Sequence, residues 1–448
     1  MDGFRSHLER VFIKIKPPEE EVSRIREDEA ARLISDAVDS LGGEMVEFLQ
    51  EIVRIPTENP PGRCYPECAR AIGRKMEDAG LDVQYVEVPG ELLPVLAPHG
   101  EALPRPSVIG KLAGANVRPL LHFTGHYDVV PAGEGWSLDP YAAIVREGKV
   151  YGRGSSDQKS GIAAQVFAIK ALGKAGLDLG GTIVSSATPD EETGGFAGLG
   201  YLVDRGFVSR DNTDFCVITE CLDVDKICLG HRGTLWLEVE TRGRQSHGSI
   251  PSEGVNAIEK MLGLLDAVRR EVLPDYDTVS RHPVMPPACR KSTLTVTMIE
   301  GGIKLNMVPA SCRASIDWRL IPEQNVEAAK ESLFELCRKM KEKDPEFEGH
   351  VREIMSVNPT LVPDDTDVVK AFQEAGQRIL GQPMGFSVSP GSDDQKFVVQ
   401  KAGLQQCIVY GPGPLAVAHK ADEFQPIGDL LTGAKVMALA TWKLVGMK

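Results

Sequence analysis

The amino-acid sequence predicts an α/β fold, with a mainly parallel sheet and flanking helices, into which a smaller α+β domain is inserted. From about residue 80 to 230, short apolar segments typical of buried strands alternate with helical segments, which is the order of βαβ units. From residue 231 to 358 the strands alternate apolar and polar residues, and then the first pattern returns. We therefore expect one larger domain over residues 1–230 and 359–448, and an inserted domain over residues 231–358.

The larger domain is expected to begin with a charged segment. Residues 1–40 are rich in charge, and we interpret them as an N-terminal surface arm that leads into a first helix over residues 33–55. Apolar segments with the length of strands lie at residues 107–112, 119–126, 181–188, 214–220 and 406–413. Helical periodicity indicates helices at residues 69–80, 161–176, 196–206, 367–381 and 428–445.

The inserted segment has the element order of a ferredoxin-like domain. Strands are expected at residues 234–243, 292–302, 311–320 and 349–357, and helices at residues 256–272 and 325–343. Along the chain this is the order β-α-β-β-α-β. Gly230 and Gly233 at one boundary, and Asn358-Pro359 at the other, are the expected hinge regions.

Composition and charge exclude several classes of partner. A hydrophobic content of 42% and a charged content of 25% are ordinary for a globular protein. The formal net charge of −14 argues against nucleic acid or an anionic membrane as a partner, although a local basic pocket can still bind a small anion. The charged N-terminus does not resemble a secretory signal, and nine scattered cysteines do not suggest a disulfide framework. We expect a reduced, cytoplasmic protein.

Acidic and histidine side chains follow the predicted strands of the larger domain. They lie just after an apolar segment or in a Gly/Pro-rich loop, and they are His126, Asp128, Asp157, Glu191, Glu192, Glu220 and His419. In open α/β sheets, ligands collect at the carboxyl ends of the strands, which brings distant sequence positions together. Carboxylates and imidazoles without a thiolate among them suit a pair of divalent ions such as zinc.

Each of these residues also has an ordinary structural interpretation. His126 alone is more often a hydrogen-bonded side chain than a ligand, and Asp128 is compatible with a turn. Asp157 is compatible with a helix cap, and Glu191-Glu192 with the acidic first turn of a helix. Glu220 is harder to explain in this way, because a buried carboxylate without a partner is costly. The combination favours a single site.

The motifs resemble those of the M20 metallopeptidase and amidohydrolase family. HYDVVP, GRGSSDQKSG, PDEETGG, the strand-end Glu220, SHGSIPSEGVNAI and GPG…AH…DEF occur in the family's order, from roughly residue 45 to the C-terminus. The resemblance implies two divalent metal ions, zinc first, with cobalt or manganese as alternatives. It implies that Asp157 bridges them, that His126 and Glu220 complete one set of ligands, and that Glu192 and His419 complete the other.

The same resemblance implies the catalytic roles. Glu191 becomes the general base for a hydroxide shared by the two ions, and Asp128 accepts the imidazole N–H of His126. A cis peptide bond is implied at Asp157-Gln158. His247 of the inserted domain is implied to reach across a dimer interface and to stabilise the tetrahedral oxyanion, with a structural loop histidine as the alternative.

Substrate-binding residues are implied in the same way. Asn306 and Arg319 resemble family positions that bind the substrate carboxylate, and Gly391-Ser392-Asp393 resembles a loop whose backbone amides also bind it. A salt bridge with Asp317 is the alternative for Arg319. The chain departs from the family at Asp394-Gln395-Lys396, where an arginine is usual, so the resemblance leaves the preferred acyl group open.

Together these observations predict a dinuclear zinc hydrolase that cleaves an amide bond next to a free carboxylate. The expected substrate is a small N-acyl amino acid or a short peptide, and the expected assembly is a homodimer formed through the inserted domain. A dipeptidase or carboxypeptidase of the same family is the second hypothesis. A catalytically silent homologue that acts as a scaffold is the third, and neither nucleic acid nor a membrane is expected as a partner.

Overall fold

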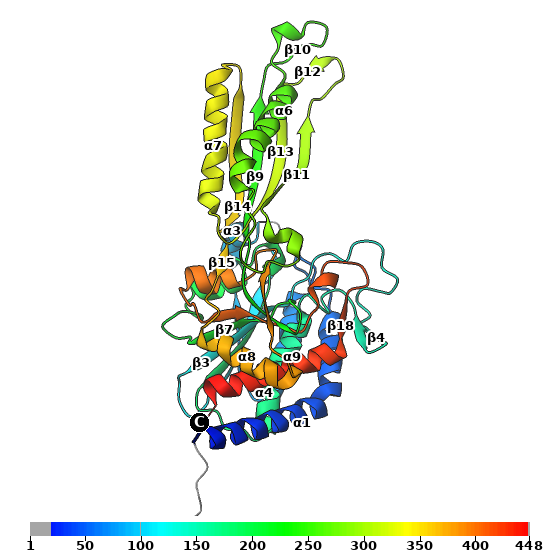
Figure 1. Cartoon of the computed structure of the whole chain (residues 1–448). Helices are drawn as coiled ribbons and strands as arrows, with labels where there is room; N and C mark the ends of the chain where they lie inside the picture. The colour runs from blue at the N-terminus through cyan, green and yellow to red at the C-terminus, as the bar shows by residue number, and fades with distance from the viewer. Residues whose placement is uncertain (1–18, 99, 447–448) are drawn as a thin grey trace, which may run out of the picture.

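A computed structural model describes residues 19–98 and 100–446, and it shows an α/β domain from which a long insert projects (Figure 1). The central sheet has the strand order β1-β2-β6-β3-β7-β17-β8-β15, and β16 also pairs with β8. Its strands are β1 Asp82–Glu87, β2 Pro106–Leu112, β3 Leu120–His126, β6 Thr182–Thr188, β7 Phe215–Ile218, β8 Lys226–His231, β15 Thr360–Leu361, β16 Gly385–Ser389 and β17 Cys407–Val409. The neighbours β6, β3, β7 and β17 are parallel, as predicted, while β1, β2 and β15 pair antiparallel.

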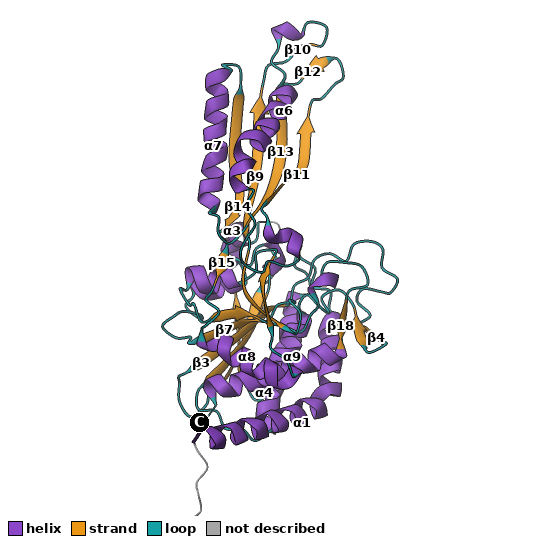
Figure 2. Ribbon diagram, viewed as in Figure 1, coloured by secondary structure: helices purple, strands orange, loops and turns teal. Residues whose placement is uncertain are grey.

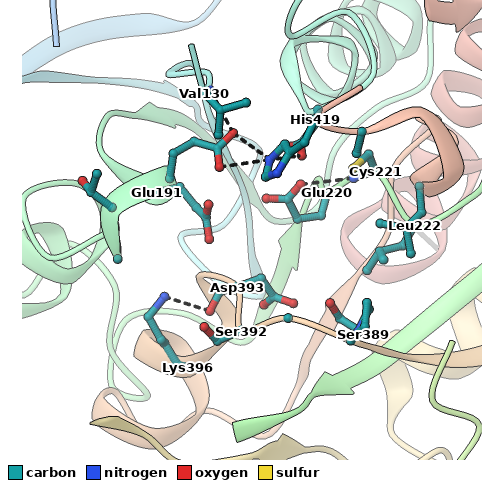
Figure 3. A pocket seen from close by; sticks show the side chains of 18 of the residues that line it. Val130, Glu191, Glu220, Cys221, Leu222, Ser389, Ser392, Asp393, Lys396 and His419 are labelled. Atoms are coloured by element: carbon teal, nitrogen blue, oxygen red, sulfur yellow. Dashed lines mark hydrogen bonds and ion pairs between the residues drawn. The ribbon is translucent and has the colours of Figure 1, made fainter. Parts of the chain in front are cut away.

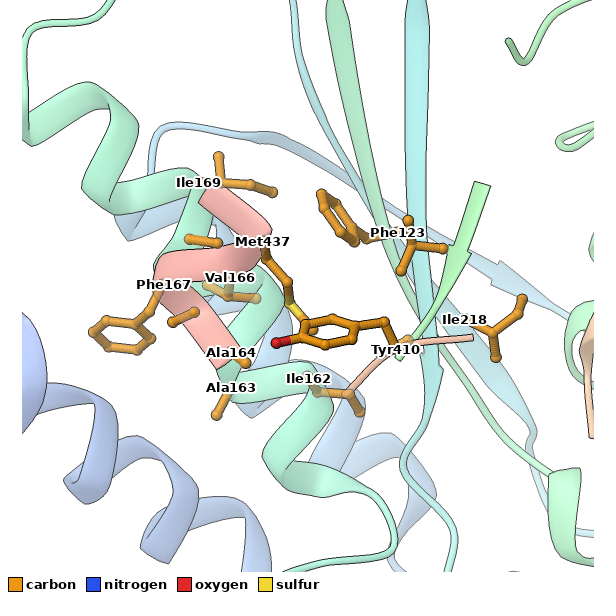
Figure 4. Close-up of a cluster of buried hydrophobic side chains, with 14 of the residues drawn as sticks. Phe123, Ile162, Ala163, Ala164, Val166, Phe167, Ile169, Ile218, Tyr410 and Met437 are labelled. Atoms are coloured by element: carbon orange, nitrogen blue, oxygen red, sulfur yellow. The ribbon is translucent and has the colours of Figure 1, made fainter. Parts of the chain in front are cut away.

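Helices cover the central sheet and form the main core with it. They are α1 Glu19–Val53, α2 Tyr65–Asp78, α3 Leu93–Leu96, α4 Lys159–Lys174, α5 Leu199–Asp204, α8 Asp367–Leu380 and α9 Ile427–Val445. Every residue of β3 is buried, which is typical of a central parallel strand. Figure 4 shows Phe123 of β3 in one apolar cluster with Val166 and Ile169 of α4 and Met437 of α9. No helix in the described part of the chain has the length and hydropathy needed to cross a membrane.

The first helix differs from the expected arm over residues 1–40. Helix α1 begins at Glu19, and its Ile34 and Val38 are fully buried in the main core. Apolar residues recur at helical spacing along this segment, so one face packs against α4 and α9 while the charged residues face solvent. The high charge density was therefore a poor guide to an arm over residues 27–40, and residues 1–18 lie outside the described residues.

The insert is a four-stranded antiparallel sheet with two helices. Its elements are β9 Gly233–Arg242, α6 Ala257–Ala267, β11 Thr293–Gly301, β13 Ser311–Leu320, α7 Val326–Lys343 and β14 Glu348–Val357, with the sheet order β11-β13-β9-β14. This is the predicted element order. A separate core forms around Trp318 and Leu237 where both helices pack on the sheet. The short strands β10 Ser246–His247 and β12 Met307–Val308 pair at the end of the insert that lies far from the α/β domain (Figure 2).

Candidate metal and active site

The parallel strands bring five acidic and histidine residues to one edge of the sheet. His126 is the last residue of β3, Glu192 lies in the short turn after β6, and Glu220 lies two residues beyond β7. Asp157 comes from the loop between β5 (Lys149–Tyr151) and α4, and His419 from the loop after β17. We call His126, Asp157, Glu192, Glu220 and His419 the five-residue cluster. The predicted convergence at the carboxyl ends of the strands is present.

Asp157 lies between two histidines. Its Oδ1 atom is 3.3 Å from Nε2 of His126, and its Oδ2 atom is 3.2 Å from Nε2 of His419. On one side, Glu220 Oε1 is 3.0 Å from the same His126 nitrogen. On the other side, Glu192 Oε2 is 3.1 Å from the His419 nitrogen. Figure 3 shows His419 and Glu220 at the pocket wall. The cluster thus consists of two sets of donors that share one carboxylate.

The chemistry of His126 fits a bound cation. Its Nδ1 lies 3.0 Å from the backbone carbonyl oxygen of Asp128, which accepts hydrogen bonds only, so Nδ1 carries the proton of the neutral ring. The Nε2 lone pair then faces the carboxylates of Glu220 and Asp157, and this buried nitrogen has no hydrogen-bond partner among the described residues. Burial lowers the pKa of His126, but Glu220 and the other carboxylates raise it well above its usual range. A proton or a metal ion is therefore needed between these atoms.

The carboxylate of Asp128 has a different partner from the expected one. It lies 3.4 Å from Nδ1 of His126, whose proton is given to the Asp128 backbone instead. The carboxylate oxygens accept the backbone N–H groups of Glu191 and Glu192, each at 3.1 Å, and the side-chain amide of Asn59 at 2.9 Å. Asp128 therefore holds the turn that carries both glutamates.

A buried network that the sequence analysis missed anchors the same turn. Asp190 adopts a left-handed backbone conformation with φ of 65° and is 1% exposed. Its carboxylate accepts hydrogen bonds from Arg105, from the Tyr65 hydroxyl at 2.9 Å and from Asn59 at 3.1 Å. Asn59 thus connects Asp190 to Asp128. The left-handed conformation of Asp190 directs Glu191 and Glu192 back toward the end of β3. In the sequence, the only indication of this network was the aspartate in PDEETGG.

Glu423 performs a similar role for Asp157. One of its oxygens accepts the backbone N–H groups of Ser156 at 2.9 Å and of Asp157 at 3.0 Å, and the other accepts from Arg153 at 2.5 Å. The Asp157-Gln158 peptide bond is cis, as the resemblance implied. Glu423 belongs to the DEF motif, but no local pattern indicates its contact with a loop more than 260 residues earlier.

A pocket of about 470 Å³ opens over the cluster. Trp236, Arg319 and Met355 of the insert line it, together with Glu191 and the loop at Gly391 and Ser392. Burial raises the pKa of Glu191 well above its usual range, although His126 opposes that effect. Glu191 points into the pocket without a bonded partner among the described residues, and its Oε2 is 4.0 Å from Nε2 of His126 (Figure 3).

Two cations of the pocket wall already have protein partners. The Arg319 guanidinium donates to both carboxylate oxygens of Asp317, at 2.7 and 3.0 Å, and to the Thr234 hydroxyl at 2.9 Å. Lys396 donates to the backbone carbonyl of Asp393 at 3.1 Å and lies 3.7 Å from Asp394. The departure from the family at this loop therefore places a buried ammonium group in the pocket.

His247 and Asn306 are not brought to the cluster. Both lie at the far end of the insert, where the N–H of Gly248 donates to the carbonyl of Asn306 at 2.9 Å. His247 is exposed, and its Nδ1 is 2.7 Å from the Ser249 hydroxyl. Neither residue lines the pocket. The structure groups these two residues with each other, at a distance from Glu191 and Arg319.

Comparisons with known proteins agree with this fold. The chain is 29% identical over 328 residues to a succinyl-diaminopimelate desuccinylase of Marinobacter nauticus, covering 72% of this chain and 82% of that protein. It is 28% identical over 329 residues to an acetylornithine deacetylase of Myxococcus xanthus, covering 73% and 81%. Its fold matches that of human carnosine dipeptidase 1 with a TM-score of 0.72 and 20% identity, covering 92% and 98% of the two chains.

The family model for peptidase family M20/M25/M40 matches residues 122–443. That range is more than half of the chain, and it begins in β3 and ends in α9, so it spans all five residues of the cluster. The chain belongs to peptidase family M20/M25/M40, a family of metal-dependent hydrolases.

Proposed function

We propose that this hydrolase is a dinuclear metal amidohydrolase that removes the acyl group from an N-acyl amino acid or a related small carboxylate. The observation that carries the proposal is the position of Asp157, whose two oxygens face two different histidines. Deacylation is favoured because two relatives are a desuccinylase and a deacetylase. A dipeptidase is the second candidate, because carnosine dipeptidase 1 shares the fold.

The five-residue cluster would hold the two metal ions. His126, Glu220 and Asp157 would bind one ion, and His419, Glu192 and Asp157 the other. Oxygen and imidazole donors suit zinc, and cobalt or manganese would also fit such a set. Two bound ions would polarise the substrate carbonyl and lower the pKa of water.

Glu191 is the proposed general base. It projects into the pocket beside the cluster, and its carboxylate has no hydrogen-bond partner among the described residues, so it is available to accept a proton. It would take a proton from the attacking water and transfer it to the nitrogen of the leaving amine. The Asp128 carboxylate keeps Glu191 in this orientation through the Glu191 backbone N–H.

The substrate carboxylate is proposed to bind at the pocket wall formed by Arg319 and the Gly391-Ser392 loop. Asp317 and Thr234 fix the orientation of the Arg319 guanidinium, so little side-chain entropy is lost on binding. Because Asp317 already neutralises Arg319, the backbone amides of the loop would contribute much of the carboxylate recognition.

A second copy of the chain is proposed to supply His247 and Asn306. Strand β9 has ten residues and so spans about 33 Å, and the pocket lies near its first residues. A rigid insert that pivots at Gly233 moves its far end on an arc around the pocket and does not bring His247 into it. A homodimer formed through the inserts would place the far end of the partner's insert at the pocket. His247 of the partner subunit would then stabilise the developing oxyanion.

The test compares Glu191→Gln with wild type and with Glu134→Gln, an exposed glutamate used as the matched control. Each protein is reconstituted with zinc, its metal content is measured, and it is assayed on N-acetyl, N-succinyl and N-formyl amino acids and on dipeptides. Glu191→Gln should retain two metal ions and lose about a thousandfold in turnover, as expected for a lost general base.

Full turnover by Glu191→Gln would refute the proposed role of Glu191. Turnover of dipeptides alone by wild type would favour the second candidate. Two bound metal ions with no turnover of any substrate would contradict the proposed substrate class.

A further inference from the structure

Cys221 places a thiol beside the proposed metal ligands. A ligand atom from each of Asp157, Glu220 and Cys221 lies within 4.8 Å of the other two. Cys221 is 4% exposed, is a free thiol and lines the pocket (Figure 3). The ligands predicted from the sequence include no thiolate, so this cluster was not expected.

Two contacts hold Cys221 in this position. Its backbone N–H donates to Oε2 of Glu220 at 3.2 Å, so the carboxylate and the thiol come from one tight turn. The loop after β17 packs directly against the other side of Cys221. A Cβ atom at Gly413 would lie 2.7 Å from the Cys221 Cβ, so only glycine allows this close approach. The backbone and the Cβ of Cys221 are therefore held next to Glu220.

An independent observation points to a cation at the same place. Nε2 of His126 is buried without a hydrogen-bond partner among the described residues, and it lies 3.0 Å from Glu220 and 3.3 Å from Asp157. These are the two carboxylates that the Cys221 thiol also approaches. Two carboxylates are thus shared by a group that contains a thiol and by a buried imidazole nitrogen that lacks a partner.

We propose that Cys221 is a sulfur ligand for the ion held by His126, Asp157 and Glu220, and that it makes this position selective for soft and borderline cations. Cys221 would bind such an ion as a thiolate, and its proton would be released to solvent. Thiolate ligands favour cadmium, zinc and cobalt over manganese, whereas carboxylates alone do not discriminate in this way. The inference rests on the proposed metal centre and goes beyond it in naming a ligand and a selectivity.

The first test uses the absorption spectrum of cobalt-substituted protein. Metal-free wild type, Cys221→Ser and the control Cys289→Ser, whose thiol lies in the insert, are titrated with Co²⁺. Wild type and Cys289→Ser should show a near-ultraviolet thiolate-to-cobalt charge-transfer band, and Cys221→Ser should lose it. A band of equal intensity in Cys221→Ser, or no band in wild type with Co²⁺ bound, would overturn the inference.

The second test measures metal affinity by calorimetry. Cys221→Ser should bind Cd²⁺ about tenfold or more weakly than wild type and bind Mn²⁺ within about twofold, because only the soft cation gains from sulfur. Equal losses for both cations would instead indicate a distorted site. Cys221→Ala is the second variant, so that a folding defect of one variant does not decide the result.

The tests distinguish this inference from the proposed function. Failure of wild type to bind Co²⁺ in equilibrium dialysis would refute the metal centre, and the inference with it. A charge-transfer band that depends on Cys221, in a protein that hydrolyses no amide, would support the inference and refute the proposed function.

Discussion

The buried ion pair between Arg105 and Asp190 predicts a large effect of a substitution outside the pocket. Arg105 is fully buried and Asp190 is 1% exposed. We choose Arg105→Met, which keeps much of the side-chain volume and removes the charge. The matched control is Arg118→Met, because Arg118 donates to both oxygens of Asp214 in a pair that is 45% and 25% exposed.

The magnitude follows from burial. Removal of one partner of a buried pair costs about 3–5 kcal/mol, because the other charge is left without compensation. Arg105 also donates to the backbone carbonyls of Pro61, Glu101 and Leu103, at 3.1, 3.0 and 2.8 Å, which supports the upper part of that range. The exposed pair of Arg118 should contribute about 1 kcal/mol or less.

The assay is scanning calorimetry of metal-free protein, followed by zinc titration. At roughly 2 °C per kcal/mol, a loss of about 4 kcal/mol lowers the melting temperature of the larger domain by about 8 °C. Zinc affinity should also fall by about 10- to 100-fold, because Asp190 anchors the turn of Glu192. The double variant Arg105→Met/Asp190→Asn should recover part of the stability. Equal shifts for Arg105→Met and Arg118→Met would refute the reasoning.

Two further predictions concern assembly and pH. Mixing equal amounts of His247→Ala and Glu191→Gln chains should restore about a quarter of the wild-type sites if subunits pair at random, and no recovery after verified subunit exchange would contradict action across a dimer. Partial burial raises the pKa of Glu44, but hydrogen bonds from Lys170 and Lys75 outweigh it and hold that pKa below 4.5. The resulting stability is present above the unfolded pKa and is lost as pH falls through the lowered pKa. Melting curves of Lys170→Met from about pH 3 to pH 7 should therefore show a weaker acid dependence than wild type.

The elements that the sequence predicted well are those with a strong period. Strand β3 and helix α4 are rich in apolar residues, and β9 and β13 alternate regularly, so their class and approximate bounds followed from the sequence pattern. Strands β8 and β16 were missed. Each is short and depends on pairing with a neighbour that is distant in sequence, which a local pattern does not contain.

The candidate ligands could be predicted, but the residues that hold them could not. Each of the five residues is an imidazole or a carboxylate in a motif that follows a strand or lies in a Gly/Pro-rich loop. The contacts of Asn59, Tyr65 and Arg105 with Asp190 span between 85 and 131 positions, and no local pattern marks those residues. The expected hydrogen bond from His126 to Asp128 joins the predicted residues, but its acceptor is the backbone carbonyl oxygen of Asp128 and not the carboxylate. Both oxygens compete for the same Nδ1 proton.

The partners of the buried acids near the pocket show which carboxylates lack a compensating positive charge. Asp190 has Arg105, Glu423 has Arg153, and Asp394 has Lys396 at 3.7 Å. Asp128 has backbone and amide N–H groups instead of a cation. Five acids that line the pocket have no arginine or lysine in ion-pair contact within the described part of the chain, namely Asp157, Glu191, Glu192, Glu220 and Asp393. One oxygen of Asp393 accepts the backbone N–H of Gln395 at 2.9 Å.

Asp157, Glu191, Glu192 and Glu220 share only two histidines. A buried carboxylate without compensation costs several kcal/mol. The fold supplies a permanent cation to Asp190, Glu423 and Asp394 and none to these four acids, which leaves positive charge to be supplied from outside. The same arrangement explains why Glu191 differs from its neighbours. It is the member of the four that lies 4.0 Å from the nearest histidine nitrogen and faces open pocket, so it remains free to accept a proton when the other three are engaged.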